Sequence, residues 1–420
     1  MKKALFISYY WPPSGKASLQ WPLKIVKHLI SFGWQITVLT VDEDTFSHSD
    51  SSFISEIQSG LNVIRAKTFE PFNIYKKFTG KGKDEKLVAS ETISTKNKKL
   101  SHRLSLWIRM NLFIPDARVG WYFPAIKEIT GYLKTESVDL IVSIGPPHTT
   151  HLIAKKLSSK FKLPFMPVFI DPWTDIAYYK NFKRSKFTRA IDNHFEKSIL
   201  KNSSANIFVT ETMKKDYESK YSFIKEKSHV LYWGYSEEEF ENIKMTKRNE
   251  DEKVIVHAGN LFSYQNPTNF WKKLKDKIDL GNKYVIKFIG TVDSEIVKTI
   301  NDNGLKPYTQ YLGFLPYKKM LEEVCNADYL LVCATEPRHV PGKLFEYLRA
   351  GKPIIAFGDG NNEVKNILEK ANAGMMFNYD ETGEKILKDQ DLINTDMEYV
   401  KNFERKNIAQ SMIKILNQLN

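Results

Sequence analysis

Short apolar runs alternate with amphipathic segments along the whole chain. The runs that predict buried strands lie at residues 4–7, 35–41, 139–144, 165–170, 206–209, 229–232, 253–257, 284–289, 329–333, 353–357 and 374–377. Between the first two runs, apolar side chains recur at spacings of three and four and predict an amphipathic helix over residues 19–32. Strands that alternate with helices are typical of parallel sheets with helices on both faces.

The alternation of strands and helices occurs twice, and a polar, charge-dense stretch at residues 236–253 separates the two halves. We therefore predict an α/β protein with two Rossmann-like, doubly wound parallel-sheet domains that face each other across a cleft. The first domain would cover residues 1–235 and the second residues 236–402, with a C-terminal helix at about 403–420 packing back on the first. Ligands of doubly wound sheets bind beyond the carboxyl ends of the strands, so we expect the site there.

A Pro-Gly turn at Gly342 precedes a predicted short helix in the second half. The backbone N–H groups at the start of a helix can face an anion, and Lys343 adds a positive charge at the same place. Glu346 lies one helical turn later on the same face. Gly351 and Pro353 end the helix. Groups that bind phosphate and hydroxyl would thus lie together, which suits a nucleotide sugar.

Three loops of the first half also follow predicted strands. Gly15 could bring backbone amides close to a phosphate, with Lys16 beside it, although the three-glycine dinucleotide pattern is missing. His148 and His151 lie three residues apart at a helix start, but no carboxylate or cysteine accompanies them locally, which argues against zinc. A substrate contact and a helix-capping role both remain open for these histidines.

The third loop carries two carboxylates, Asp171 and Asp175, on either side of Trp173. It follows a predicted strand, where a catalytic side chain would face the cleft. The alternative is a helix start at which one of the two carboxylates is the cap.

The composition excludes several classes of protein. The 420 residues are 42% hydrophobic and 26% charged, with a mean hydropathy of −0.39, and no apolar run approaches the length of a membrane span. Only two cysteines occur, Cys325 and Cys333, which favours a reducing, cytoplasmic location. The net charge of +13 fits nucleic acid, an anionic membrane or phosphorylated substrates, or a lysine-rich proteome. No nucleic-acid-binding motif is present.

One basic segment breaks the alternation. Residues 76–109 contain ten Lys or Arg against three Asp or Glu, and the aromatic, apolar stretch 104–114 overlaps their end. Basic charge beside such a stretch is typical of peripheral contact with an anionic membrane, here the inner face of the cytoplasmic membrane. The alternative is a solvated loop followed by a core helix.

Several of these motifs, in this order, resemble those of family 4 glycosyltransferases, which are retaining enzymes with the GT-B fold. Asp171-Pro172-Trp173 resembles an element of the polysaccharide-assembly subgroup. The other matching stretches are the loop at residues 9–13, the strand at 33–40, the interdomain stretch at 230–235, the start of the donor domain at 257–260, the base-binding loop at 311–315 and the Val-Pro-x-Lys-x-x-Glu-Tyr motif at 340–347. The resemblance covers nearly the whole chain.

The resemblance implies transfer of a sugar from a nucleotide sugar, UDP- or GDP-linked, without metal or cofactor. The acceptor would be a glycan or lipid-linked glycan in bacterial surface polysaccharide synthesis. The first domain would then bind the acceptor and the second the donor. The implied catalytic residues are Asp171 and Glu346. The implied donor-binding residues are Gly15, Lys16, Gly259, Asn260, Phe314, Leu315, Arg338, Gly342, Lys343 and Glu346, and the acceptor-binding residues are His148, His151, Trp173 and Asp175.

The chain departs from the family pattern at several positions. Arg338 occupies the place of the first of two glutamates, and Glu346 matches the second. Asn260 and Gln265 lie where the family usually has the Arg and Lys that hold the donor diphosphate, and Trp233 replaces the interdomain Asn. The missing first glutamate leaves a non-catalytic sugar-binding or scaffold subunit of a polysaccharide-assembly complex as an alternative to the transferase. A second alternative is a nucleotide-sugar epimerase, another enzyme on the same architecture.

Overall fold

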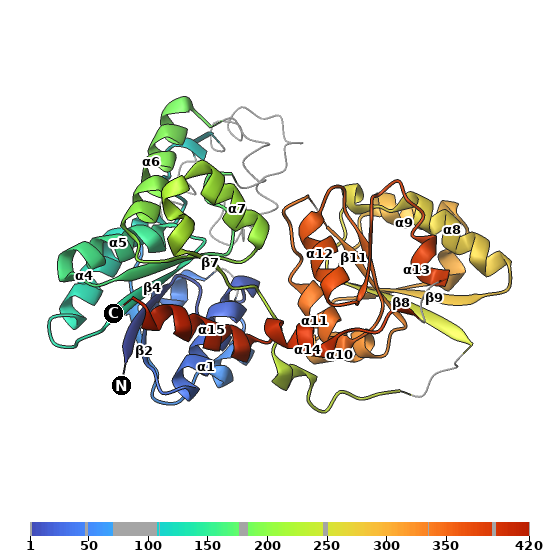
Figure 1. Ribbon diagram of the computed structural model, residues 1–420, viewed down its shortest axis with the longest axis horizontal. Coiled ribbons are helices and arrows are strands. Elements are labelled where there is room, and N and C mark those ends of the chain that lie inside the picture. Colours follow the sequence, from blue (N-terminus) through green and yellow to red (C-terminus); the bar gives the residue numbers. More distant parts are fainter. Residues whose placement is uncertain are drawn as a thin grey trace. The chain divides into compact units, whose positions relative to one another are not determined.

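The chain folds into two compact units, which are described here from a computed structural model. The structure describes residues 2–46, 49–69, 107–108, 110–175, 184–246, 251–334, 336–388 and 392–419. Unit 1 comprises Met1–Leu231 and Ala409–Asn420, and unit 2 comprises Tyr232–Ile408. Each unit contains one parallel sheet with helices on both sides (Figure 1).

Unit 1 is built on a seven-stranded sheet in the order β3-β2-β1-β4-β5-β6-β7. Its strands are β1 (Lys3–Ser8), β2 (Gln35–Val41), β3 (Asn62–Ala66), β4 (Leu140–Gly145), β5 (Phe165–Phe169), β6 (Asn206–Phe208) and β7 (Ser228–Val230). The central strand β1 pairs with both β2 and β4, so that Ala4 lies opposite Ile36 on one side and Leu140 on the other. The strand order reverses between β1 and β4, which is where doubly wound sheets place their ligands.

Helices connect these strands and cover the sheet. They are α1 (Gln20–Ser31), α4 (Tyr122–Tyr132), α5 (Thr149–Phe161), α6 (Lys186–Asn202), α7 (Glu211–Lys220) and the C-terminal α15 (Arg405–Asn417). Short 3-10 turns lie at Ala17–Leu19, Glu43–Thr45, Ser51–Glu56, Val119–Trp121 and Ser222–Lys227. Side-chain caps begin two of the helices: Ser185 accepts the Thr188 N–H of α6, and Thr210 accepts the Met213 N–H of α7.

Unit 2 repeats the arrangement with six strands in the order β10-β9-β8-β11-β12-β13. The strands are β8 (Glu252–Ala258), β9 (Lys283–Ile289), β10 (Thr309–Gly313), β11 (Tyr329–Cys333), β12 (Ile354–Phe357) and β13 (Gly374–Phe377). The helices are α8 (Thr268–Asp279), α9 (Ser294–Asp302), α10 (Tyr317–Cys325), α11 (Lys343–Ala350), α12 (Asn362–Lys370), α13 (Glu384–Lys388) and α14 (Met397–Val400), with 3-10 turns at Glu237–Phe240, Ser263–Gln265, Lys306–Tyr308 and Lys401–Phe403.

Both faces of the unit 2 sheet are buried. Val254 and Val256 belong to one apolar cluster, whereas Ile255 between them belongs to the other. Because successive side chains of a strand point to opposite faces, the run must be apolar throughout rather than alternating. This explains the continuous apolar runs in the sequence.

The predicted strands and the α/β class are confirmed, each strand within about two residues of its predicted bounds. Two strands were missed, β3 and β10, and both lie at sheet edges. In β10 no residue is fully buried, so its sequence lacks the apolar signal of the central strands. The helix predicted over 19–32 is α1, preceded by a 3-10 turn. Most of the basic segment 76–109 lies outside the described residues.

The last helix, α15, begins in unit 2 and ends in unit 1, because the boundary between the units falls after Ile408. In its second half, Met412 and Leu416 are fully buried (0% exposed). The C-terminal residues therefore contribute to the core of the unit that contains the N-terminus.

We expect Leu416→Ala to destabilise unit 1 by about 2–5 kcal/mol, because it removes fully buried methyl groups and leaves a cavity. Urea unfolding followed by hydrogen exchange in unit 1 peptides would measure this. The exposed Lys414 on the same helix provides the control, since Lys414→Ala should change stability little. Equal effects of the two substitutions would show that the helix end is not part of the core.

Candidate active site

Three glycines line the carboxyl edge of the unit 2 sheet. Gly259 follows β8, Gly290 follows β9 and Gly313 ends β10, and their φ angles are +110°, +109° and +64°. The Gly259 N–H donates to Ile289 O, and the Gly290 N–H donates to Gly313 O, both at 2.7 Å. A Cβ on Gly290 would lie 2.8 Å from Gly259 O. Positive φ and this close approach both require glycine, so bare backbone is exposed along this row.

The ammonium group of Lys343 lies directly against this backbone. A Cβ on Gly259 would be 2.6 Å from Lys343 Nζ. Lys343 Nζ also lies 3.3 Å from His257 Nε2, and His257 Nδ1 lies 2.9 Å from Leu331 O. Because a carbonyl only accepts, His257 carries its proton on Nδ1 and presents a lone pair on Nε2 to the ammonium. Lys343 is thus held by a neutral acceptor.

Burial shifts the pKa values of both Lys343 and His257. Burial lowers the pKa of Lys343 to about 8, with the charges of Cys333 and Glu346 opposing the shift. Burial also lowers the pKa of His257 well below its ordinary value, and the positive charge of Lys343 lowers it further. Lys343 therefore changes its charge close to neutral pH while His257 remains neutral.

Glu346 lies one turn further along α11 and is 6% exposed. The Tyr317 hydroxyl donates to its Oε1 at 3.1 Å, whereas its Oε2 is buried without a hydrogen-bond partner among the described residues. Burial raises the pKa of this carboxyl, and the charge of Arg405 is the first of the opposing influences. Arg405 is itself held by Trp233 O (3.2 Å) and Ser236 Oγ (3.1 Å). A buried acceptor atom without a donor is costly, and a ligand hydroxyl would satisfy it.

The other predicted donor residues of unit 2 lie on loops at the same edge of its sheet. Asn260 Oδ1 accepts the Thr291 N–H at 3.2 Å, and Gly342 precedes α11 next to the Trp233 ring. Phe314 and Leu315 follow β10, and Phe314 is 91% exposed.

Arg338 is an exposed residue of the loop at 336–339. Asn361 fastens this loop by donating to Glu336 O (3.0 Å) and His339 O (2.7 Å). The structure thus brings Gly259, Lys343 and the carboxylate of Glu346 to one edge of the sheet.

In unit 1, His148 and His151 are buried at the carboxyl end of β4. The His148 ring stacks on Trp173 with centroids 4.7 Å apart and an interplanar angle of 5°, and His151 Nδ1 lies 2.8 Å from Ser143 Oγ. Burial lowers the pKa of His148 to about 3 and that of His151 well below its ordinary value. A Cβ on Gly145 would lie 2.4 Å from His151 Nε2 and 3.0 Å from His148 Nδ1, so the two rings require glycine there.

Asp171 lies just beyond β5, two residues before Trp173. It is partly buried, and burial alone raises the pKa of its carboxyl. Among the described residues, none is hydrogen-bonded to or ion-paired with this carboxylate. A carboxyl group with a raised pKa at the end of a parallel strand is a candidate general base or acid.

Trp173 is fixed by the helices that follow it. Its backbone N–H donates to the Tyr217 hydroxyl (2.8 Å), its indole N–H donates to Asp192 (3.2 Å), and the Tyr217 hydroxyl donates to Glu196 Oε1 (2.9 Å). Arg184 forms an ion pair with Asp192 and donates to Met110 O at 3.1 Å. The side chain of Trp173 is therefore fully occupied in the core of unit 1.

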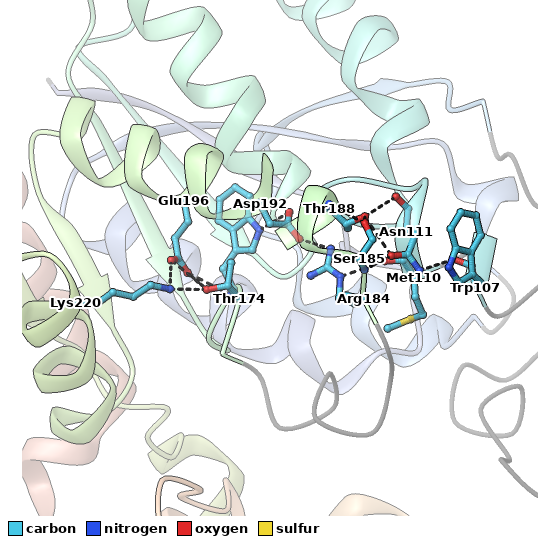
Figure 2. A network of polar contacts seen from close by, with 11 residues as sticks. Trp107, Met110, Asn111, Thr174, Arg184, Ser185, Thr188, Asp192, Glu196 and Lys220 are labelled. Carbon is cyan, nitrogen blue, oxygen red and sulfur yellow. Dashed lines mark hydrogen bonds and ion pairs between the residues drawn. The ribbon is translucent and has the colours of Figure 1, made fainter. Parts of the chain in front are cut away.

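Glu196 is fully buried. It lies at one end of the network of polar contacts drawn in Figure 2. It accepts hydrogen bonds from Lys220 Nζ (2.7 Å), the Tyr221 hydroxyl (2.8 Å) and the Thr174 hydroxyl (3.0 Å). Lys220 also forms an ion pair with the exposed Asp175 at 3.0 Å. At the other end of the network, Asn111 joins the start of α6 by accepting the Ser185 N–H at 2.6 Å.

The predicted residues Gly15 and Lys16 lie on the loop after β1. Lys16 is exposed and immediately precedes the 3-10 turn at Ala17–Leu19. Arg65 steadies the same loop by donating to Pro12 O at 2.8 Å. This loop is at the carboxyl end of β1, next to the point where the strand order of unit 1 reverses.

Sequence reasoning missed the polar side chains that hold the predicted residues and their neighbours. In unit 2 these are His257, Tyr317 and Arg405. In unit 1 they are Asp192, Glu196, Tyr217, Tyr221 and Lys220. One signal existed: Asp192 and Glu196 are four residues apart and share a helix face with the buried Ile199, so two carboxylates lie on an otherwise apolar face.

The comparisons with known proteins agree with this geometry. The sequence family described as glycosyl transferases group 1 matches residues 238–405, which include Gly259, Lys343 and Glu346. The matched residues all belong to unit 2. No curated protein sequence matches the chain. The matched region contains the glycine row and the Lys343–His257 pair described above.

Solved structures share the fold over the whole chain at low sequence identity. Anabaena Alr3699/HepE, in complex with UDP and glucose, matches with a TM-score of 0.61 and 14% identity over 100% of both chains. Sucrose-phosphate synthase from Thermosynechococcus elongatus matches with a TM-score of 0.60 and 13% identity over 100% of this chain and 99% of that one. The lipopolysaccharide outer core galactosyltransferase WaaB matches with a TM-score of 0.58, 13% identity and the same coverage. The fold is that of GT-B glycosyltransferases.

Two negative findings complete the description. Within the residues that the structure describes, no group of three or more His, Cys, Asp or Glu side chains is arranged to hold a metal ion. In the same part of the chain, no helix is both long and apolar enough to cross a bilayer.

We expect unit 1 to lose stability as the pH falls below about 6.5, because the unfolded chain takes up protons that the buried histidines cannot. The pKa of His148 is lowered to about 3. The contribution of its neutral ring to the stability of unit 1 is therefore complete above pH 6.5 and is lost as the pH falls from 6.5 to 3. Over this range, the free energy of unfolding should fall by about 1.4 kcal/mol per pH unit for each buried histidine. Urea unfolding at several pH values, read by hydrogen exchange in unit 1, measures it.

His148→Phe keeps a ring against Trp173 but removes one titrating group, so it should reduce this slope. The exposed His194 on α6 provides the control, because His194→Gln should leave the slope unchanged. A slope that is the same in all three proteins would contradict burial of a neutral His148.

Proposed function

We propose that the chain transfers a sugar from a nucleotide sugar to a glycan or lipid-linked acceptor, with retention at the anomeric carbon and without a metal. The group 1 domain and the GT-B fold support sugar transfer. The observation that carries the proposal is Lys343, a partly buried ammonium against bare glycine backbone at the carboxyl edge of the unit 2 sheet.

The chemistry requires stabilisation of charge. As the glycosidic bond to the donor breaks, the sugar becomes oxocarbenium-like and the leaving diphosphate gains negative charge. Lys343 and the backbone around Gly259 and Gly342 would stabilise that charge without reorganising, which is worth several kcal/mol in a dry site. UDP is one ligand of the similarly folded HepE structure, which supports a diphosphate at this edge.

The rest of the donor would lie along the same edge. The unsatisfied Oε2 of Glu346, one helical turn from Lys343 on α11, would accept a hydrogen bond from a hydroxyl of the ribose. Backbone groups near Phe314 and Leu315 would hold the base. Recognition of the nucleotide would then lie within unit 2.

Unit 1 would bind the acceptor. Asp171, whose pKa is raised by burial, would orient the acceptor hydroxyl or accept its proton. Galactosyltransferase WaaB, named for its role on a lipopolysaccharide core, supports a glycan acceptor. We further propose a role in bacterial surface polysaccharide synthesis at the cytoplasmic membrane, where the basic segment 76–109 would contact anionic lipid.

We expect one class of nucleotide, UDP or GDP, to stabilise the protein in a thermal-shift panel that also contains ADP, CMP and the common nucleotide sugars. At a hundred times the dissociation constant the gain is about 2.7 kcal/mol. Lys343→Ala should weaken binding by about 10- to 100-fold, the value of a hydrogen bond to a charged group. Because the pKa of Lys343 is lowered to about 8, the affinity of the wild type should fall as the pH rises through that value.

Lys365→Ala provides the matched control, because Lys365 is an exposed lysine of the same unit that pairs with Glu369 at 3.9 Å. It removes the same charge but should leave nucleotide binding unchanged. Absence of any nucleotide effect on the wild type would favour a scaffold subunit. Conversion of the donor sugar without an acceptor would instead identify an epimerase.

We expect Asp171→Asn to lower sugar transfer by about 100-fold or more, the usual contribution of a general base. It should leave thermal stability at neutral pH equal or higher. The pKa of Asp171 is raised by burial, so the folded state loses stability as the pH rises from the ordinary carboxyl pKa to the raised one, and Asn removes that loss. Transfer assays and melting curves measure the two effects.

Asp139→Asn is the contrasting control. Asp139 accepts the Lys3 N–H at 2.6 Å at the amino end of the sheet, so its substitution should cost some stability without affecting transfer. Unchanged transfer in Asp171→Asn would exclude Asp171 from the reaction.

A further inference from the structure

We propose that Tyr217 is a positioning residue for Asp171, and that its hydroxyl does this by fixing the backbone of Trp173. This inference rests on the proposed function, in which Asp171 acts on the acceptor and Tyr217 of α7 would hold Asp171 in place. Tyr217 lies 46 positions after Asp171 in the sequence and is 3% exposed. It does not itself contact the Asp171 carboxylate in any hydrogen bond between described residues.

The position of Asp171 depends on the residues before and after it in the chain, because its own carboxylate has no polar partner among the described residues. On its amino side, the Ile170 N–H donates to Gly145 O at 2.9 Å, which continues the pairing of β4 and β5. On its carboxyl side, Trp173 is held by Tyr217, by Asp192 and by the ring of His148. The position of Asp171 is therefore set by an anchor before it and an anchor after it.

The Tyr217 hydroxyl can perform this task because its hydrogen-bond directions are fixed. The Trp173 backbone N–H can only donate, so it uses a lone pair of the Tyr217 oxygen. The hydroxyl proton then goes to Glu196 Oε1, a buried carboxylate that can only accept while ionised. Burial and the charge of Glu196 raise the pKa of Tyr217 well above its ordinary value, so the phenol keeps this proton.

The chain contains a matched control for the Tyr217 hydroxyl. Tyr221 lies one helical turn beyond Tyr217, just after α7, is 8% exposed and donates from its hydroxyl to Glu196 Oε2 at 2.8 Å. Removal of either hydroxyl takes one hydrogen-bond donor from Glu196. Only removal of the Tyr217 hydroxyl also leaves the Trp173 N–H without its acceptor. A purely structural network predicts similar consequences for the two substitutions, whereas positioning predicts different ones.

The experiment compares Tyr217→Phe with Tyr221→Phe in the full chain. Tyr217→Phe should lower kcat for sugar transfer by about 10- to 100-fold, in the range caused by a misplacement of about 1 Å, and should leave the affinity for the donor nucleotide unchanged. Tyr221→Phe should lower kcat by less than about 2-fold. Titration of the Asp171 carboxyl by carbon-13 NMR gives a second readout: its pKa should shift towards the ordinary value in Tyr217→Phe and stay unchanged in Tyr221→Phe.

Equal losses of kcat in the two variants, or an Asp171 titration that moves in both or in neither, would overturn the inference. Failure of the proposed function is visible separately, because the wild type would then show no transfer and no nucleotide binding. In that case the NMR titration still decides whether the Tyr217 hydroxyl controls the surroundings of Asp171.

Discussion

Burial of ionisable side chains governs the electrostatics at the strand ends of both units. Lys343 lies against a neutral histidine, and Asp171 has no polar partner among the described residues. Each group loses hydration that a neutral neighbour does not replace, so the pKa of the lysine falls and that of the aspartate rises. The rest of each unit must hold these side chains in place against that cost, and this explains why polar networks surround them.

The strand order determines where these groups meet. In unit 2, β8 and β11 are neighbours, with Val256 opposite Leu330. One residue further along both strands, His257 reaches Leu331 O, and this bond fixes the tautomer that accepts from Lys343. In unit 1, β4 and β5 carry Gly145 and Asp171 to neighbouring strand ends in the same way. Residues far apart in sequence thus converge at neighbouring strand ends of a parallel sheet, and in unit 2 these strands also flank the point where the strand order reverses.

Features that depend on consecutive residues could be predicted from the sequence. The helix at Lys343–Ala350 and its left-handed terminus at Gly351 follow from a Pro-Gly start and a Gly-x-Pro end. The contact between Trp173 and Tyr217 could not be predicted, because it joins positions 44 residues apart through the packing of α6 and α7 on the sheet. Glu196 gave only a weak signal, its i, i+4 spacing from Asp192, because a glutamate on a helix is usually exposed; the fold shows that it is buried.

The departures from the family pattern have a structural explanation in unit 2. Gln265 is buried, and its amide donates to Cys333 O at 2.6 Å and accepts the Phe262 N–H at 3.0 Å, so it ties the loop after β8 to β11. Asn260 is likewise engaged with the backbone of Thr291. A cation at either position would break these bonds and leave backbone groups unsatisfied. On α11, Lys343 supplies positive charge at this edge, and it can lie against Gly259 because that residue has no side chain.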